Sequence, residues 1–257
     1  MTDGPTIGQR PLLVLPTFNE RDNLVPIVKA IRSQLPRATI WIVDDNSPDG
    51  TGAIADELAA SDPCVAVFHR PRKLGLGTAY AEAFQRALAD DFDCVFQMDA
   101  DFSHDPSYLP VLLAELENVD LVIGSRYVDG GGTRNWSVLR RAISRGGNLV
   151  ARVGLGVEVH DTTGGYRVYR RATLEQLRFE DLCLRGYGFQ IEVVFQIERR
   201  GLQIKEVPII FVERRAGSSK MSKDIALEAF LHIIRRRFEM IRGRQEPDAR
   251  QSRVLEK

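Results

Sequence analysis

Short apolar runs alternate with amphipathic stretches along most of the 257-residue chain, and this alternation limits its possible folds more than any other feature. The predicted strands cover residues 11–15, 39–43, 65–68, 95–98 and 121–123. Each of the first four is followed by a stretch with apolar residues at helical spacing. Strands separated by helices are typical of an α/β fold, a Rossmann-like, mostly parallel sheet flanked by helices.

Composition excludes some classes of protein and leaves others open. The formal net charge is zero, so overall charge favours neither nucleic acid nor a membrane. No apolar run approaches the ~20 residues that span a bilayer, and the polar first nine residues predict a loose tail with no signal peptide. Of the scattered cysteines Cys64, Cys94 and Cys183, the first two are expected to be small core residues in a reducing compartment.

Polar clusters follow at least four of the predicted strands. They are Phe18-Asn19-Glu20, Asp44-Asp45, Asp99 with Asp101, and Ser125-Arg126. In sheets of this kind ligands bind at the carboxyl ends of the strands, so we expect these clusters to line one crevice.

Asp99 and Asp101 follow the apolar run at 95–98 and are separated only by Ala100. In an extended chain residues i and i+2 point the same way, so the two carboxylates would share one side. Such a pair suits Mg²⁺ or Mn²⁺, which prefer oxygen ligands and usually share them with substrate phosphates. The alternative is a pair of solvated loop acids.

Local signals predict several helix starts. Asp105 stands before a proline, as an N-cap stands before a first-turn proline. Asn19 or Asn23 is expected to cap the helix that runs to about residue 35. Gly75 and Gly77 lack the third glycine of a dinucleotide fingerprint, so they predict a close-packed helix start, with phosphate contact by exposed amides as the alternative.

The second half of the chain is locally basic. Arg134, Arg140, Arg141 and Arg145 occur with no acidic residue between them, around a helical apolar pattern. They form either a solvated basic face or an anion site, because arginine binds phosphate through paired donors. The loop at 213–222, with Arg214 and Lys220, is expected to be a lid that orders on a phosphate donor.

A last helix is predicted over residues 224–242, with a broad apolar face and arginines near its end. Residues 214–257 carry twelve lysines and arginines against six acids. The apolar face can dock on the domain's own core, which is the commoner fate, or lie on an anionic bilayer. The basic residues lack interleaved aromatics and a recognised module, so we expect no nucleic-acid partner.

A metal beside basic side chains suits a diphosphate, and a second arginine-rich site suits another anionic substrate. These features together predict transfer from a nucleotide-diphosphate donor to a phosphate-bearing acceptor. Such an acceptor is already ionised at neutral pH, which agrees with the lack of an obvious His or Glu base.

The strand-end motifs also occur in a recognisable order. They are Pro16-Thr17-Phe18-Asn19-Glu20, Asp44-Asp45-x-Ser47-Pro48-Asp49-Gly50-Thr51, Lys73-Leu74-Gly75-Leu76-Gly77-Thr78-Ala79-Tyr80 and Asp99-Ala100-Asp101-x-Ser103-His104. Three more follow: Gly124-Ser125-Arg126-Tyr127, Ile143-Ser144-Arg145-Gly146 and Val207-Pro208-Ile209-x-Phe211-Val212. From about Pro11 to Lys220 the chain resembles the dolichol-phosphate mannosyltransferases, or polyprenol monophosphomannose synthases, of glycosyltransferase family two, which have the GT-A fold.

This resemblance implies an inverting transfer of mannose from GDP-mannose to a polyprenyl phosphate, with Mg²⁺ or Mn²⁺ as cofactor. It implies a guanosine pocket lined by Pro16, Phe18, Glu20, Val43 and Asp45. It places Asp99, Ala100 and Asp101 at the diphosphate, with Asp99 and Asp101 on the metal. Arg126 would face the transferring phosphates, Arg214 and Lys220 would close over the donor, and Arg126, Arg140 and Ser144 would hold the lipid phosphate.

The sequence departs from the family pattern at two positions and lacks one feature of some members. Phe18 replaces the usual tyrosine, and Ser103 stands where some members have a metal-binding glutamine. The membrane spans of some members are missing, so we expect a peripheral protein at the cytoplasmic face of a membrane, with a separate membrane-anchor protein as a possible partner. Two alternatives stay open: another donor such as UDP-glucose, or a binding subunit with a vestigial site.

The resemblance and the last helix together suggest a division of the chain. We expect a GT-A catalytic domain over residues 1–220, a C-terminal amphipathic helix over 221–243 and a disordered tail over 244–257.

Overall fold

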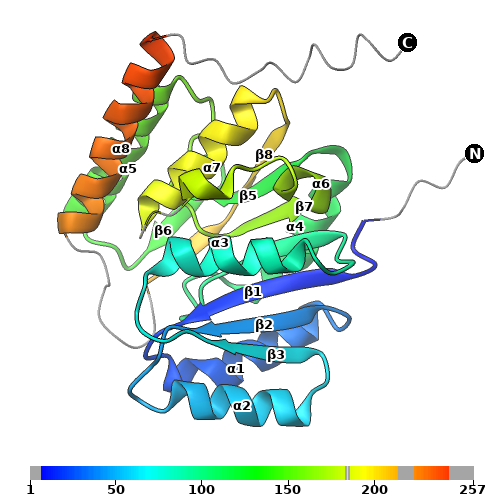
Figure 1. Ribbon diagram of the computed structural model, residues 1–257. Helices are drawn as coiled ribbons and strands as arrows, with labels where there is room; N and C mark the ends of the chain where they lie inside the picture. Colours follow the sequence, from blue (N-terminus) through cyan, green and yellow to red (C-terminus); the bar gives the residue numbers. More distant parts are fainter. Residues whose placement is uncertain (1–6, 183, 185, 214–222, 243–257) are drawn as a thin grey trace, which may run out of the picture.

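A computed structural model describes residues 7–182, 184, 186–213 and 223–242 of the chain (Figure 1). Its main sheet contains β1 (Pro11–Thr17), β2 (Thr39–Asp44), β3 (Val65–His69), β4 (Cys94–Gln97), β5 (Leu121–Ser125), β7 (Arg167–Arg170) and β8 (Ile204–Pro208). The strand order is β3-β2-β1-β4-β7-β5-β8. β2 and β3 lie on one side of β1, and β4 lies on the other, so the strand order reverses between β1 and β4. In sheets of this kind ligands bind at the point of reversal.

The sheet is mostly parallel, as predicted, with one antiparallel strand. β7 runs antiparallel to both of its neighbours, β4 and β5. It is an interior strand of the sheet, between β4 and β5.

Helices cover both faces of the sheet (Figure 1). One face carries α1 (Arg21–Gln34), α2 (Thr51–Ser61) and α4 (Leu109–Glu115), and the other carries α3 (Leu76–Ala87), α5 (Val138–Leu155) and α7 (Tyr187–Arg199). An apolar core lies on each face of the sheet, and alternate residues of β1 belong to different cores. Leu12 and Val14 pack toward α3, and Leu13 and Leu15 pack toward α1. Both faces of the strand are therefore apolar, which explains its continuous apolar run.

Smaller elements complete the chain. They are η1 (Pro106–Tyr108), η2 (Leu116–Asn118), β6 (Gly132–Arg134), α6 (Arg171–Leu174), η3 (Phe179–Leu182) and β9 (Ile210–Val212). Residues 204–212 contain two strands, because the second, β9, leaves the main sheet and pairs with β6 as a two-stranded ribbon.

Two local predictions need correction. Helix α1 has Glu20 at its N-cap position, so neither Asn19 nor Asn23 caps it. Asn19 instead adopts a left-handed backbone conformation, with a φ of 56°. Cys64 is exposed, unlike the buried Cys94, because it precedes β3 at the rim of the sheet.

Two other helix starts are confirmed. Asp105 accepts a hydrogen bond from the Ser107 amide at 2.9 Å and caps η1. Gly75 is the N-cap of α3, with a φ of 105°. A Cβ on Gly77 would meet the Leu184 carbonyl oxygen at 2.0 Å, so only glycine fits this close-packed start.

The last helix, α8 (Lys223–Ile241), lies beside α5 at one side of the molecule (Figure 1). Of the two fates left open for its apolar face, docking on the core is not the one observed: Leu227, Phe230 and Phe238 are about half exposed. The helix is held instead by its other side, where Ala229 and Ile233 are buried. Among the described helices, none combines the length and apolar character needed to cross a membrane.

Candidate active site

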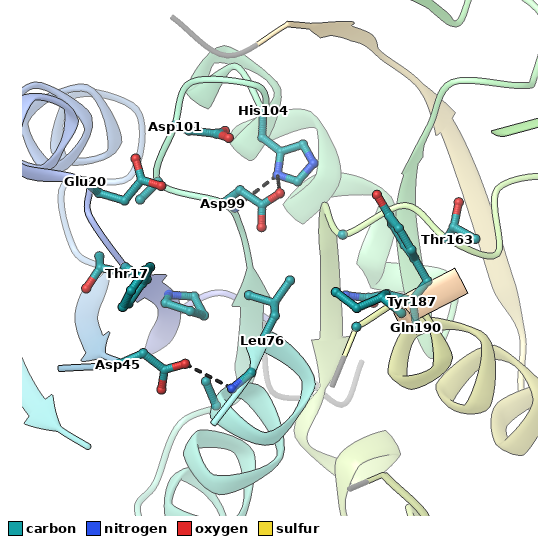
Figure 2. A pocket seen from close by; sticks show the side chains of 18 of the residues that line it. Thr17, Glu20, Asp45, Leu76, Asp99, Asp101, His104, Thr163, Tyr187 and Gln190 are labelled. Carbon is teal, nitrogen blue, oxygen red and sulfur yellow. Dashed lines mark hydrogen bonds and ion pairs between the residues drawn. The ribbon is translucent and has the colours of Figure 1, made fainter. Parts of the chain in front are cut away.

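One pocket of about 430 Å³ opens at the carboxyl ends of β1, β2 and β4. Nine of the residues predicted for the site line it: Pro16, Phe18, Glu20, Asp45, Asp99, Ala100, Asp101, Arg126 and Arg140. Figure 2 shows Glu20, Asp45, Asp99 and Asp101 around this hollow, with Thr163, Tyr187 and Gln190 on another wall. The expectation that polar strand ends form one crevice is confirmed, and the roles given to single residues remain predictions.

Four predicted residues lie elsewhere. Val43 is buried in the core near the end of β2. Ser144 lies on α5 and does not line the pocket, and its hydroxyl accepts a hydrogen bond from Tyr127 at 2.6 Å. Arg214 and Lys220, with most of the predicted lid, lie outside the described residues.

The turns after β1 and β2 are tied together by Asp44. Its carboxylate accepts hydrogen bonds from the Thr17 hydroxyl at 3.0 Å and from the Ser47 hydroxyl at 2.5 Å. Glu20 is held nearby, because its backbone N–H donates to the Thr51 hydroxyl at 3.0 Å. The two strand ends therefore form one rigid wall.

Asp45 has fixed partners in this wall. Its Oδ1 accepts a hydrogen bond from Nη1 of buried Arg70 at 2.5 Å, and its Oδ2 accepts from the Gly75 amide at 3.1 Å. Arg70 also donates to Thr78 at 2.7 Å, which links the wall to the start of α3. A carboxylate oxygen can accept more than one hydrogen bond, so Asp45 can receive further donors from a ligand.

Asp99 and Asp101 lie on a bent loop after β4, not on the extended chain that the prediction assumed. Phe102 adopts a left-handed conformation with a φ of 61°, which is strained for a bulky side chain and turns the loop sharply. The Asp101 carboxylate accepts a hydrogen bond from the Ser103 amide at 3.0 Å. Both aspartates line the pocket despite the bend.

His104 supports this loop and also lines the pocket. Its Nδ1 accepts a hydrogen bond from the Asp99 amide at 3.1 Å, so its proton is assigned to Nε2. The ring stacks on Tyr166 at 4.8 Å between centroids and meets the edge of Phe211 at 5.4 Å. Burial lowers the pKa of His104 to about 4, so the imidazole is neutral at physiological pH.

Arg126, at the end of β5, is paired with a buried carboxylate. Its Nε and Nη2 donate to Asp161 at 2.7 and 2.6 Å, and Nη2 also donates to the Thr163 hydroxyl at 2.9 Å. Burial favours neutral forms of both partners, but their attraction outweighs it, so the pKa of Arg126 is raised and that of Asp161 is lowered. Both stay charged, and the fork geometry aims the guanidinium at the pocket.

A second arginine comes from α5. Arg140 pairs with Glu213, and its guanidinium lies 4.1 Å from the ring centroid of Trp136. Arg126 lies 5.5 Å from the same ring, so one indole contacts both cations. This arrangement brings two positive groups to one side of the pocket.

No role was predicted for His104, Trp136, Asp161 or Thr163, although all but Asp161 line the pocket. His104 stood inside a quoted motif, so only its role was missed. Asp161 and Thr163 precede β7, and their closeness to Arg126 depends on the central position of that strand, which no local pattern reveals.

The residues present fit a hard divalent cation in part. Asp99 and Asp101 supply the carboxylate oxygens that Mg²⁺ and Mn²⁺ prefer. Within the described ranges no group of three or more His, Cys, Asp or Glu residues is placed to hold a metal ion. Ligands beyond these two carboxylates would have to come from substrate phosphates or water, as is usual for Mg²⁺.

Comparison with known proteins gives three results. The family model described as "Glycosyl transferase family 2" matches residues 12–178. Undecaprenyl-phosphate mannosyltransferase of Micrococcus luteus is 46% identical over 226 residues, which cover 88% of this chain and 93% of that protein. Polyprenol monophosphomannose synthase of Mycolicibacterium smegmatis is 45% identical over 241 residues, which cover 91% of each protein.

A solved structure shows the same fold. Glucosyl-3-phosphoglycerate synthase from Mycobacterium tuberculosis, in complex with Mn²⁺, UDP-glucose and phosphoglyceric acid, matches with a TM-score of 0.65 and 21% sequence identity. The match covers 90% of this chain and 80% of that chain. At this identity the likeness shows the fold alone, and it confirms the expected GT-A architecture.

Proposed function

The chain belongs to glycosyl transferase family 2, and on that premise we propose that it transfers mannose from GDP-mannose to a polyprenyl phosphate. The names of its two relatives support the sugar and the acceptor class. The observation that carries the proposal is one pocket in which two neighbouring carboxylates, Asp99 and Asp101, lie together with Arg126 and Arg140. Such a site has opposite charges where a metal-bound diphosphate and a second anion would meet.

The donor nucleoside would lie against the wall built from β1 and β2. Phe18 offers a ring for stacking, beside Pro16, while Glu20 and Asp45 offer carboxylate acceptors for the N–H groups of guanine. Because the Val43 side chain is buried in the core, any contact of this residue with the base would come from its backbone. The hydrogen bonds from Arg70 and Gly75 hold Asp45 in place before the donor arrives.

Asp99 and Asp101 would hold Mg²⁺ or Mn²⁺, which would neutralise the charge that develops on the departing diphosphate. The chain's own contribution is to position these carboxylates. His104 fixes the Asp99 backbone, and the Ser103 amide holds Asp101. Ala100, between the two aspartates, is buried and lines the pocket beside the diphosphate position.

The acceptor phosphate would bind on the side of the two arginines. Asp161 uses Nε and Nη2 of Arg126, which leaves Nη1 for a phosphate oxygen. Arg140 lies on the same side, and Ser144 on the next turn of α5 positions the Tyr127 hydroxyl. One oxygen of the acceptor phosphate would form a bond to the anomeric carbon of mannose. The bond between that carbon and the diphosphate oxygen would break at the same time, GDP would leave, and the configuration of the anomeric carbon would be inverted. The phosphate is ionised at neutral pH, so the step needs no general base.

A polyprenyl phosphate is itself a membrane lipid, so the protein would work at a membrane surface. We propose the cytoplasmic face, with an anchor protein as a possible partner.

Arg214 and Lys220 are proposed to close over the donor from the lid at residues 213–222. We also keep the proposed division into a catalytic domain over 1–220, a helix over 221–243 and a tail over 244–257.

The proposal is tested with a panel of labelled nucleotide sugars and a short-chain polyprenyl phosphate in detergent. We expect label from GDP-mannose to enter the lipid fraction only with Mg²⁺ or Mn²⁺, and Asp101→Asn to lower the rate at least a hundredfold. Glu57→Gln, the same chemical change on the exposed side of α2, should leave the rate unchanged. Preference for UDP-glucose would show that the proposed donor, GDP-mannose, is wrong. Full activity of Asp101→Asn would refute the proposed role of the two aspartates.

A further inference from the structure

Two side chains that line the pocket have a buried polar atom with no hydrogen-bond partner in the part of the chain that the structure describes. The two atoms are Nε1 of Trp136 and Oε1 of Gln190. Trp136 lies beside Arg126 and Arg140, on the side proposed for the acceptor phosphate. Gln190, on α7, belongs to another wall of the pocket. A buried amide oxygen without a partner is destabilising, so its presence at a pocket points to a ligand that completes it.

A second glutamine of α7 shows how a purely structural carboxamide is bonded. Gln190 and Gln196 are almost equally buried, with 2% and 1% of their surface exposed. Oε1 of Gln196 accepts a hydrogen bond from the Arg178 amide at 2.8 Å, and its Nε2 donates to Glu192 at 2.9 Å. Both ends of the Gln196 carboxamide are therefore satisfied within the protein, whereas Gln190 lines the pocket with an unsatisfied oxygen.

The position of Gln190 is set by the core around it. Its neighbour Phe189 is fully buried and stacks on Tyr80, with 5.9 Å between the ring centroids. The backbone oxygen of Gln190 accepts a hydrogen bond from Nη1 of buried Arg167 at 3.0 Å. Nε of Arg167 also donates to the Gly164 backbone oxygen at 2.8 Å, which ties this turn of α7 to the loop before β7. The backbone is fixed, but the terminal torsion of a glutamine turns easily, so either end of its carboxamide can meet a ligand.

The carboxamide lies close to the loop that carries Asp99. A Cβ on Gly165, which lines the pocket, would lie 3.6 Å from Nε2 of Gln190 and 3.5 Å from Cε1 of His104. His104 in turn accepts the hydrogen bond from the Asp99 amide. Gln190 and Asp99 thus border the same hollow from different elements (Figure 2).

The chain beside Gln190 also leads to Arg126. Thr163 accepts a hydrogen bond from Nη2 of Arg126 at 2.9 Å, and it lines the pocket together with Gly165 and Gln190. The proposed function puts the diphosphate at Asp99 and the acceptor phosphate at Arg126. The sugar that passes from one to the other must lie between them, which brings it to the wall that contains Gln190.

A neutral carboxamide suits a sugar hydroxyl. A carboxamide accepts and donates hydrogen bonds, and a hydroxyl does both as well, so the two groups can pair in either orientation. The carboxamide is uncharged, so it does not repel the two anions of the proposed reaction, as a carboxylate at the same position would. A site that binds a hydroxyl in this way discriminates against a sugar that lacks it, because the buried polar group is then left unpaired.

We propose that the Gln190 carboxamide binds a hydroxyl of the transferred hexose and so contributes to the choice of sugar. The hydroxyl supplies the partner that the Gln190 oxygen lacks in the free protein. This role rests on the proposed function for the place of the sugar in the pocket. It does not depend on the hexose being mannose, because any hexose transferred at this site would meet the same wall.

The test is a cycle that combines Gln190→Met with donors that each lack one sugar hydroxyl. Transfer from GDP-mannose and from its four monodeoxy forms is compared by kcat/KM in the unmodified chain and in the variant. We expect Gln190→Met to lower kcat/KM for GDP-mannose roughly tenfold. Removal of the hydroxyl that Gln190 binds should cost about as much in the unmodified chain and nothing further in the variant. The other deoxy donors should lose the same factor in both proteins.

Two other glutamines serve as controls. Gln85→Met makes the same change on an exposed side chain of α3 and should leave kcat/KM unchanged. Gln196→Met breaks hydrogen bonds within the protein, so it should lower the melting temperature more than Gln190→Met does. Any loss of activity in Gln196→Met should be the same factor for every donor, because that residue does not line the pocket.

The same donors separate failure of this proposal from failure of the proposed function. If every deoxy donor loses the same factor in the unmodified chain and in Gln190→Met, Gln190 does not bind the sugar, and the proposal is overturned although GDP-mannose is the donor. If the chain transfers glucose from UDP-glucose, deoxy forms of that donor are used, and coupling to one hydroxyl would support Gln190 while rejecting GDP-mannose. If no donor is transferred, the proposed function fails, and the dissociation constants of the same donors with Mn²⁺ decide on Gln190 by the same comparison.

Discussion

His104 acts on the pocket at the scale of a single residue, through its position and not through its charge. Its buried ring holds the Asp99 amide, stacks on Tyr166 and stays neutral at physiological pH. The loop that it supports includes the strained Phe102, whose left-handed conformation must be held by its surroundings. We therefore regard His104 as a positioning residue for the Asp99 and Asp101 carboxylates.

Replacing His104 separates its hydrogen bond from its ring. His104→Leu should leave the Asp99 amide without an acceptor, lower the free energy of unfolding by about 1–3 kcal/mol and reduce transfer. His104→Asn keeps an acceptor atom near the place of Nδ1 and should recover part of both. His69→Asn is the control, because that ring is half exposed. Urea unfolding and the transfer assay should show a larger loss of stability and of transfer for His104→Leu than for His104→Asn. Equal losses in the two variants would contradict the positioning role.

The lowered pKa of His104 also predicts a pH dependence. The folded ring accepts a proton only near pH 4, whereas the unfolded ring accepts one near pH 6.5. Stability from the neutral ring is therefore fully present above pH 6.5 and is lost as the pH falls toward 4. Unfolding measured at pH 7 and pH 5 should show a smaller loss in His104→Asn than in the unmodified chain.

Site residues could be predicted from the sequence where they directly follow a strand. Glu20, Asp45 and Asp99 were found this way, because a parallel sheet brings the carboxyl ends of its strands to one edge. Asp161 could not be found, since its ion pair with Arg126 spans 35 residues and depends on where β7 enters the sheet. Val43 was expected in the pocket, but its side chain points into the core because alternate residues of a strand face opposite sides.

At the scale of elements, local pattern located most strands and helices, while their partners depended on distant contacts. β7 is too short to show periodicity, and its antiparallel place between β4 and β5 comes from pairing with both neighbours. The separation of β9 from β8 likewise reflects its pairing with β6. For α8 the sequence showed an apolar stripe but not its direction, because the buried Glu192 that orients the helix lies on α7.

Two glycines of α5 test how that helix holds α8. Gly154→Ala should place a methyl group against buried Ile233 and lower the free energy of unfolding by about 1–3 kcal/mol. Gly147→Ala has no atom within 4 Å of the added carbon, so it should raise stability by about 0.5–1 kcal/mol through helix propensity. Thermal or urea unfolding checks both, and destabilisation by Gly147→Ala or none by Gly154→Ala would contradict the described packing.

At the scale of the whole molecule, the zero net charge conceals a strongly uneven distribution. Acidic groups gather on the pocket wall built from β1, β2 and β4, and arginines gather on α5 and α8. The pocket lies where these regions meet, and it receives Arg140 from α5 and Ile225 from α8. This layout fits a protein that takes one anionic substrate from solution and another from a lipid surface.

The most direct measurement is a crystal structure of the chain with GDP, Mn²⁺ and a short-chain polyprenyl phosphate, recorded with anomalous scattering from manganese. We predict a manganese peak at the carboxylates of Asp99 and Asp101, the guanine beside Asp45, and the lipid phosphate against Arg126 and Arg140. A manganese peak away from the two aspartates, or a lipid phosphate bound outside the pocket, would contradict the proposed transfer site.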